Sequence, residues 1–317
     1  MSNSQQIEVR VQQMRYEANG IVSVELVSPA GADLPPFSAG AHIDLHLPNG
    51  VVRSYSLSNS PMERQRYVIG VLHDRNSRGG SRYVHEQLRV GSTIRIGAPR
   101  NNFPLDESAA HTVLIAGGIG ITPIYCMMNE LVRQGKSVEL FYCARTRGEA
   151  AFTQQLLADG RVKVHFNDEA GGMPDLKAFL ASKPANAHFY CCGPTPMLNA
   201  FEQFCEELNL PNVHIERFAA AEPVVAMQTG SYECELAQSK KVVLVPSGKS
   251  LLDALLDAGI QVDHSCREGV CGSCETAVID GPIDHRDGVL TKAEKASGKT
   301  MMVCVSGCSG RKLVLDL

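Results

Sequence analysis

The stretch Cys266-Arg-Glu-Gly-Val-Cys271-Gly-Ser-Cys274 lies in the last fifth of the chain, and residues 275–303 separate it from Cys304. The four cysteines follow the C-x4-C-x2-C…C spacing with which plant-type [2Fe–2S] clusters are bound. Gly269 and Gly272 lie between the ligands and can adopt the backbone angles that a tight loop requires. The stretch therefore predicts an iron–sulfur centre with Cys266, Cys271, Cys274 and Cys304 as its ligands.

Other interpretations of these cysteines remain open: a structural zinc site, a disulfide pair, or buried inert thiols. A zinc site usually combines two short C-x2–4-C or H-x3–5-H units, whereas Cys304 has only Cys308 nearby, at a different spacing. Disulfides are disfavoured because the sequence shows no secretory signal. The balance favours the iron–sulfur interpretation, in which electrons move one at a time and the rest of the chain must supply a donor.

The composition is that of an ordinary globular protein. The 317 residues leave room for two or three domains, and 44% of them are hydrophobic, with a net charge of −4. Neither a basic cluster that would indicate nucleic acid or a membrane surface nor a run of about 18 apolar residues occurs. Eleven cysteines without an export signal indicate a reducing compartment, so we expect a cytoplasmic protein.

Residues 1–108 have the pattern of short strands. Apolar and polar residues alternate in 7–11 and 22–26, and Asn49-Gly50 is a turn signal before residues 51–56. Glycine and proline punctuate the gaps, and helical periodicity is scarce. An antiparallel β-barrel is the simplest prediction for this segment.

Two motifs in this segment carry candidate binding groups. Residues 53–58, Arg-Ser-Tyr-Ser-Leu-Ser, place an arginine, an aromatic ring and hydroxyls along one strand. Residues 78–85, Arg-Gly-Gly-Ser-Arg-Tyr-Val-His, form a Gly-Gly turn before a short helix, where N–H groups, a hydroxyl and arginines suit a phosphate. Each motif alone is also compatible with an ordinary strand or turn.

Residues 109–228 change to an alternation of strands and helices. Residues 112–116 are a continuous apolar run, which fits a strand buried on both faces. Further strands are predicted at 138–142, 162–166 and 188–192, with helical patterns between them. This alternation predicts a parallel sheet with helices on both faces.

The turn Gly117-Gly-Ile-Gly-Ile-Thr-Pro123 follows the first of these strands. It is not the G-x-G-x-x-G dinucleotide fingerprint. A Gly-Gly-x-Gly turn between a buried strand and a helix nevertheless permits close approach of the backbone to a pyrophosphate. On local grounds, phosphate binding and a purely structural turn remain equally open.

Residues 229–317 are predicted as a third domain, joined by a linker at 219–231 that is small and polar and lacks periodicity. Its predicted elements are a hairpin, a helix and three strands, at 232–236, 241–245, 251–256, 276–279, 301–304 and 312–317. These elements surround the cysteine loop.

Together the three segments resemble, in this order, the flavin, nicotinamide and ferredoxin domains of the phthalate dioxygenase reductase family. The resemblance rests on the Arg-x-Tyr-Ser-x-Ser strand, the Gly-Gly-Ser turn, the Gly-Gly-Ile-Gly-Ile-Thr-Pro turn, a Cys-Gly-Pro motif and the cysteine loop; the turn Asp284-His-Arg-Asp287 also looks like this family. The implied fold is multidomain: an antiparallel β-barrel flavin domain at 1–108, an α/β parallel-sheet nucleotide-binding domain at 109–228, and a C-terminal β-grasp ferredoxin domain at 229–317.

The resemblance also implies which residues hold the cofactors. Those implied for FMN are Arg53, Ser54, Tyr55 and Ser56 along the flavin, Val71, Leu72 and His73 at its edge, Gly79, Gly80, Ser81 and Arg82 at its phosphate, and Phe218 stacked on its ring. Those implied for NADH are Gly118, Gly120, Thr122, Pro123, Arg145, Cys192, Gly193 and Pro194. Purely structural roles remain open for His73 and Phe218.

Ser56 and Cys192 are the implied catalytic positions. Cys192 is expected to position the nicotinamide and not to attack it, because hydride transfer needs alignment and no covalent intermediate. Arg145-Thr-Arg147 offers positive charge for a 2′-phosphate, but a similar tract occurs with NADH in this family, and Asp168 follows the next strand, where it suits a ribose hydroxyl. We therefore expect NADH.

The implied function is an NADH-dependent reductase that passes electrons to FMN, to the [2Fe–2S] cluster and then to a Rieske-type oxygenase of an aromatic-degrading or O-demethylating system. Two alternatives remain open. One is a reductase of another acceptor, such as a diiron or carnitine-type monooxygenase. The other is a non-enzymatic zinc-binding module.

Overall fold

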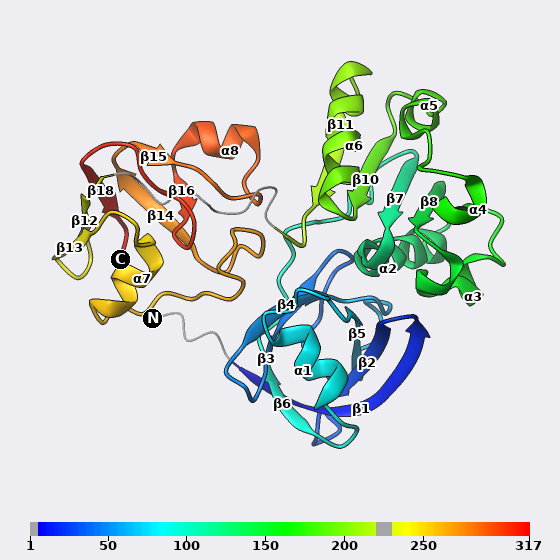
Figure 1. Ribbon diagram of the computed structural model, residues 1–317, viewed down its shortest axis with the longest axis horizontal. Coiled ribbons are helices and arrows are strands. Elements are labelled where there is room, and N and C mark those ends of the chain that lie inside the picture. Colours follow the sequence, from blue (N-terminus) through cyan, green and yellow to red (C-terminus); the bar gives the residue numbers. More distant parts are fainter. Residues whose placement is uncertain (1–5, 220–229) are drawn as a thin grey trace. The chain divides into compact units, whose positions relative to one another are not determined.

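The computed structural model describes residues 6–219 and 230–317 (Figure 1). The chain divides into two compact units, Met1–Glu216 and Arg217–Leu317. The first unit contains an antiparallel and a parallel sheet, and the second contains a mixed sheet. No helix within the described residues is both long and apolar enough to cross a membrane.

The antiparallel sheet has the strand order β4-β3-β6-β1-β2-β5. An isolated bridge between Leu57, just after β4, and Ile69 of β5 brings the two edges of the sheet together, and apolar residues from its strands form a buried cluster. This arrangement confirms the predicted barrel. Its elements are β1 (Ile7–Ala18), β2 (Ile21–Val27), β3 (His42–His46), β4 (Val52–Ser56), β5 (Arg66–Leu72), α1 (Gly80–Glu86) and β6 (Thr93–Ile96).

The second sheet is entirely parallel, with the order β11-β10-β7-β8-β9. Every residue of β7 is buried, as the continuous apolar run predicts. The elements are β7 (Thr112–Gly117), α2 (Ile121–Arg133), β8 (Val138–Ala144), α3 (Thr153–Leu156), β9 (Val162–Phe166), α4 (Asn167–Ala170), α5 (Leu176–Ala181), β10 (His188–Cys192), α6 (Thr195–Glu207) and β11 (Asn212–Glu216), with short 3-10 turns at Gly118–Gly120 and Arg147–Glu149.

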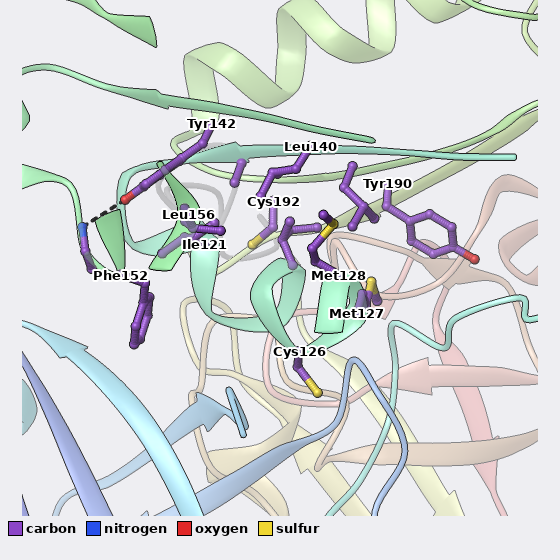
Figure 2. Packing of buried hydrophobic residues seen from close by; sticks show 14 of the residues in the cluster. Ile121, Cys126, Met127, Met128, Leu140, Tyr142, Phe152, Leu156, Tyr190 and Cys192 are labelled. Carbon is purple, nitrogen blue, oxygen red and sulfur yellow. Dashed lines mark hydrogen bonds between the residues drawn. The ribbon is translucent and has the colours of Figure 1, made fainter. Parts of the chain in front are cut away.

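Helix α2 packs its apolar face against this sheet. Met127 and Met128 of the helix belong to one buried cluster with Leu140 of β8 and Cys192 of β10, which Figure 2 shows from close by. After β7 the chain adds β8 and β9 along one edge of β7. It later returns and adds β10 and β11 along the opposite edge of β7. The strand order therefore reverses between β7 and β10, and such switch points are where open α/β sheets bind ligands.

The second unit has a sheet of order β13-β12-β18-β14-β16 and a two-stranded sheet β15-β17. Helix α7 packs on one face of the larger sheet through buried leucines. The elements are β12 (Tyr232–Leu236), β13 (Lys241–Val245), α7 (Leu251–Asp257), β14 (Glu275–Asp280), β15 (Ile283–Asp284), α8 (Lys292–Ser297), β16 (Thr300–Met302), β17 (Gly307–Cys308) and β18 (Lys312–Leu315).

One predicted strand is shorter than expected. The prediction carried it to Cys304, but β16 ends at Met302 and residues 303–305 form a turn. Within this turn the Val305 N–H donates to the Met302 carbonyl at 3.2 Å, and the Val303 N–H reaches the Cys274 carbonyl at 3.4 Å. The fourth predicted ligand therefore lies on a turn that is tied directly to the third.

Candidate nicotinamide, flavin and cluster sites

The two glycine motifs of the parallel sheet meet at its switch point. A Cβ atom on Gly120 would lie 2.3 Å from the carbonyl oxygen of Cys192, and one on Gly117 would lie 2.7 Å from Cδ of Pro194. A Cβ on Gly193 would be 3.1 Å from the backbone of Gly117. Only glycine allows these backbones to approach so closely, so the structure brings the two predicted nicotinamide motifs together.

The start of α2 is fixed against the barrel. Thr122 is buried, and its hydroxyl donates to the Ile119 carbonyl at 3.1 Å. Its methyl group fills the space beside Gly70 of β5, where a Cβ would lie 2.6 Å away. Pro123 is also buried, and Gly118 has a φ of 54°. These residues hold the turn in place within the first unit.

Ser56 and Cys192 converge on a residue that sequence reasoning had assigned no role. The Ser56 hydroxyl donates to Oε2 of Glu216 at 3.4 Å, and the Cys192 thiol lies 4.0 Å from the same oxygen. Glu216 ends β11, next to the end of β10. An acid at the end of the strand beside the Cys-Gly-Pro motif was a usable sequence signal, but its partner Ser56 is 160 positions away.

Burial favours the neutral forms of the Glu216 carboxyl and the Cys192 thiol in this trio. Part of the Glu216 side chain remains accessible, yet protein atoms surround its carboxyl, and burial raises its pKa to about 8. Burial, with Glu216 as a second cause, raises the pKa of the Cys192 thiol well above its usual range. A neutral thiol is a poor nucleophile, which agrees with a positioning role for Cys192.

The two predicted flavin motifs also lie against each other. The Arg53 side chain lies where a Cβ of Gly80 would be, 2.6 Å from Cγ, and its guanidinium donates to the carbonyls of Val52 at 2.7 Å and Arg78 at 3.4 Å. The Ser54 hydroxyl donates to Asp44 at 2.6 Å. Tyr55 packs against the barrel core, and burial raises its pKa to about 12.

Hydroxyl groups cluster at the Gly-Gly-Ser turn. The Ser81 hydroxyl donates to that of Ser77 at 3.0 Å, and the Arg82 N–H donates to Ser77 Oγ at 3.2 Å. Gly79 has a φ of 96°, and its carbonyl accepts from Asn49 at 3.2 Å. The positive φ explains why glycine is needed there.

The predicted flavin-edge residues differ in what they can offer. Val71 is completely buried in the barrel core, so only its backbone can face a ligand. Leu72 is 39% exposed. The His73 ring stacks on His85 at a centroid distance of 4.8 Å and lies 3.9 Å from Glu86.

The two other predicted cofactor residues, Arg145 and Phe218, are both exposed. The Arg145 guanidinium pairs with Glu149 at 2.9 Å, and Arg147 pairs with Glu169 at 2.9 Å. Phe218 is 40% exposed and belongs to the second unit, so its predicted stacking on the flavin stays a prediction. Most of the predicted linker lies outside the described residues.

In the second unit, the four predicted ligands form one group of buried thiols. The Cys266 side chain interacts with those of Cys271 and Cys304, and the Cys304 side chain also interacts with that of Cys274. All four are free of disulfides. Within the described residues no three His, Cys, Asp or Glu side chains converge on one ion position, whereas a [2Fe–2S] cluster distributes its four cysteines over two irons.

The loop that carries three of these cysteines wraps its backbone around them. The Glu268 N–H points to Cys266 Sγ at 3.3 Å, and the Cys266 N–H points to Cys271 Sγ at 3.5 Å. Gly269 and Gly272 have φ values of 69° and 72°, in the region that glycine favours. Buried thiols with N–H donors directed at sulfur fit a plant-type cluster.

Comparisons with known proteins find one matching family in each of the two units. Residues 234–308 match the "2Fe-2S iron-sulfur cluster binding domain" family, and residues 114–160 match the "Oxidoreductase NAD-binding domain" family. The fold and these domains define an oxidoreductase that combines a barrel, a nucleotide-binding domain and a ferredoxin domain.

Similarity over the whole chain narrows this class. The phenoxybenzoate dioxygenase subunit beta of Ectopseudomonas oleovorans is 48% identical over 98% of this chain and 97% of its own. A vanillate O-demethylase oxidoreductase of Pseudomonas sp. strain HR199 is 44% identical over 98% of this chain and 100% of its own. The solved phthalate dioxygenase reductase, described as transferring electrons from pyridine nucleotides to [2Fe–2S], superposes with a TM-score of 0.73 at 37% identity over 98% of each chain.

The chain belongs to the phthalate dioxygenase reductase family. Membership confirms the predicted fold class, the reductase function and the cofactor set of FMN, NADH and a [2Fe–2S] cluster. The prediction of an enzyme is likewise confirmed.

Proposed function

We propose that this chain takes electrons from NADH and delivers them, through FMN and a [2Fe–2S] cluster, to a Rieske-type terminal oxygenase in the cytoplasm. The observation that carries the proposal is the convergence of Ser56 of the barrel and Cys192 of the nucleotide half on Glu216. A flavin held along β4 and a nicotinamide held at the switch point would meet at this place. Three segments carry the function, with boundaries at 1–108, 109–228 and 229–317.

We assign FMN to the barrel. Arg53 to Ser56 would lie along the flavin, because this strand ends at the trio and leads toward the Gly-Gly-Ser turn. The hydroxyls of Ser77 and Ser81 and the charges of Arg53 and Arg82 would hold the phosphate. The remaining assigned residues are Val71 through its backbone, Leu72, His73, Gly79, Gly80 and Phe218.

We assign NADH to the switch point of the parallel sheet. The absence of side chains at Gly118, Gly120 and Gly193 would allow the pyrophosphate and nicotinamide to approach the backbone, with Thr122, Pro123 and Pro194 shaping the turn. NADH is favoured over NADPH because Arg145 and Arg147, the basic groups available for a 2′-phosphate, are each paired with a glutamate.

Bound FMN would supply the chemistry of accepting a hydride and releasing electrons singly. The protein's own contribution is alignment and proton handling. Cys192 limits how the nicotinamide ring can lie, and Ser56 presents its hydroxyl. Glu216 can hold a proton near neutral pH because burial raises its pKa to about 8, and its Oε2 accepts the hydrogen bond from the Ser56 hydroxyl.

The four cysteines would hold the cluster and form the electron exit. The neighbouring N–H groups would stabilise negative charge on the sulfurs and so influence the reduction potential. Eleven free cysteines support a reducing compartment. The oxygenase partner is proposed because two of the similar proteins are named for a dioxygenase and an O-demethylase.

The test is a reduction experiment with the purified holoprotein. We expect flavin absorption bands with a broad iron–sulfur shoulder, bleaching of both by NADH under anaerobic conditions, and electron delivery to a purified Rieske oxygenase. NADPH should be a poorer donor. A colourless protein would overturn the cofactor assignment, whereas a coloured protein that reduces only a diiron or other acceptor would overturn the Rieske partner alone.

A further inference from the structure

The turn Asp284–Gly288 contains a carboxylate that is fully enclosed in the second unit. The Asp287 side chain has no exposed surface. Its Oδ2 accepts the N–H groups of Leu290 at 2.8 Å and Val289 at 3.2 Å, and the Lys295 ammonium lies 3.8 Å away. Lys295 also donates to the Asp287 carbonyl at 2.5 Å. A buried carboxylate is tolerated only with such partners.

This turn is bound to the loop that carries three cysteines. The Gly288 N–H donates to the Gly269 carbonyl at 2.9 Å. A Cβ on Gly269 would lie 3.1 Å from Cα of Asp287 and 2.6 Å from Cγ2 of Val305. The backbone at Asp287 is therefore packed against the middle of the segment between Cys266 and Cys271.

The same turn is bound to the segment that carries the fourth cysteine. The Arg286 N–H donates to Ser306 Oγ at 3.2 Å, and the Ser306 hydroxyl donates to Oδ1 of Asp287 at 3.4 Å. Ser306 is buried and lies two positions after Cys304. The His285 ring closes the carboxylate from another side, with Nδ1 3.6 Å from Oδ1.

We propose that Asp287 is a positioning residue for the cluster, holding the three-cysteine loop and the Cys304 segment in fixed register. The inference rests on the proposed function, since it takes the four cysteines as cluster ligands. The two segments carrying them are 29 residues apart in sequence, at 275–303. A cluster shared by both needs their spacing held constant, and groups behind metal ligands commonly provide this.

The test compares Asp287→Asn and Ser306→Ala with Asp316→Asn in the full-length holoprotein. Asparagine keeps an oxygen for the Val289 and Leu290 N–H groups but removes the charge facing Lys295, and Ser306→Ala removes only the link to the Cys304 segment. Asp316 is exposed, and its Oδ1 accepts a hydrogen bond from the Gln238 amide at 3.0 Å, so Asp316→Asn is the matched control. The readouts are the EPR spectrum of the dithionite-reduced cluster, its midpoint potential, and anaerobic iron release to a chelator.

We expect altered EPR g values, a shifted midpoint potential and about 10–100-fold faster iron release for Asp287→Asn. Ser306→Ala should change the same quantities less, and Asp316→Asn should match the wild type. Wild-type spectra, potential and iron release in both test variants would overturn the proposal, even if their melting temperatures fell. A wild-type protein without an iron–sulfur spectrum would instead overturn the proposed function, and this inference with it.

Discussion

Each unit places a carboxyl group beside a proposed redox site, and the two carboxyl groups have opposite environments. Glu216 in the first unit has two neutral partners, a hydroxyl at 3.4 Å and a thiol at 4.0 Å. Asp287 in the second unit is held by two N–H groups, a serine hydroxyl and a nearby ammonium. The first arrangement makes ionisation unfavourable near neutral pH, and the second fixes an anion in place.

This difference follows the chemistry proposed for each site. Acceptance of a hydride would leave negative charge on the flavin, so a nearby group that can bind and release a proton would be useful there. A cluster passes electrons alone, and its performance depends on a constant ligand geometry. A weakly compensated carboxyl suits the first task and a fully bonded one suits the second.

The largest expected effect is the loss of cluster function in Cys274→Ser while the flavin and nicotinamide sites keep working. Cys274→Ser removes one of the four thiolates, so we expect loss of the iron–sulfur absorption and of electron delivery to the oxygenase, with NADH oxidation by a dye retained. Cys308→Ser is the matched control, because Cys308 is buried in the same unit and its thiol donates to the Lys312 carbonyl at 3.2 Å. Continued delivery by Cys274→Ser would mean that electrons leave elsewhere.

The next largest effect is expected at the proposed nicotinamide site of the first unit. In Gly120→Ala the new methyl group would lie 2.3 Å from the Cys192 carbonyl oxygen. Because that oxygen belongs to the backbone, the clash can be relieved only if the backbone itself moves. We expect kcat/KM for NADH to fall by at least about 100-fold while the iron–sulfur spectrum persists. Gly160→Ala is the control, because its methyl group would enter open space and should leave kcat/KM unchanged. Unchanged kinetics in Gly120→Ala would contradict the proposed nicotinamide position.

Glu216→Gln tests the proton-exchanging side of the comparison. Wild-type NADH oxidation should fall as pH rises through about 8, because ionised Glu216 would oppose negative charge arriving at the flavin. The amide cannot ionise, so the variant should lack this inflection. Its rate should be about tenfold lower, less than for most general acid–base groups because the contact with Ser56 survives. A pH profile identical to the wild type would remove Glu216 from the mechanism.

The same substitution has a predictable effect on stability. The Glu216 pKa rises from 4.5 in the unfolded chain to about 8 in the fold. Between these values the unfolded chain binds fewer protons, so wild-type stability falls as pH rises from 4.5 to 8 and is level above 8. Thermal melting should therefore show Glu216→Gln gaining roughly 2–4 kcal/mol on the wild type between pH 5 and pH 8. A constant difference across this range would contradict the raised pKa.

Sequence reasoning succeeded where chemistry is encoded locally. The spacing of the first three cysteines, the apolar run of β7 and the glycine turn after it each lie within about ten residues. Glu216 and Asp287 had no assigned role, because their significance depends on contacts with Ser56, Gly269 and Ser306 that only the folded chain creates. The strand that stops at Met302 was mispredicted for a related reason: the N–H groups of Val305 and Ser306 donate to the Met302 carbonyl and turn the chain away from the ladder.

The smallest expected effect is at Arg145, which was predicted to contact NADH. Arg145 is 72% exposed in its side chain and pairs with Glu149 at 2.9 Å. Exposed ion pairs contribute at most about 1 kcal/mol, so Arg145→Ala should change the KM for NADH by less than about fivefold and leave the cluster spectrum intact. The more informative quantity is the ratio of kcat/KM for NADH and NADPH. If Arg145 is already neutralised by Glu149, removing it leaves this ratio nearly constant, whereas a marked loss of NADPH activity alone would show that the arginine is available to a 2′-phosphate.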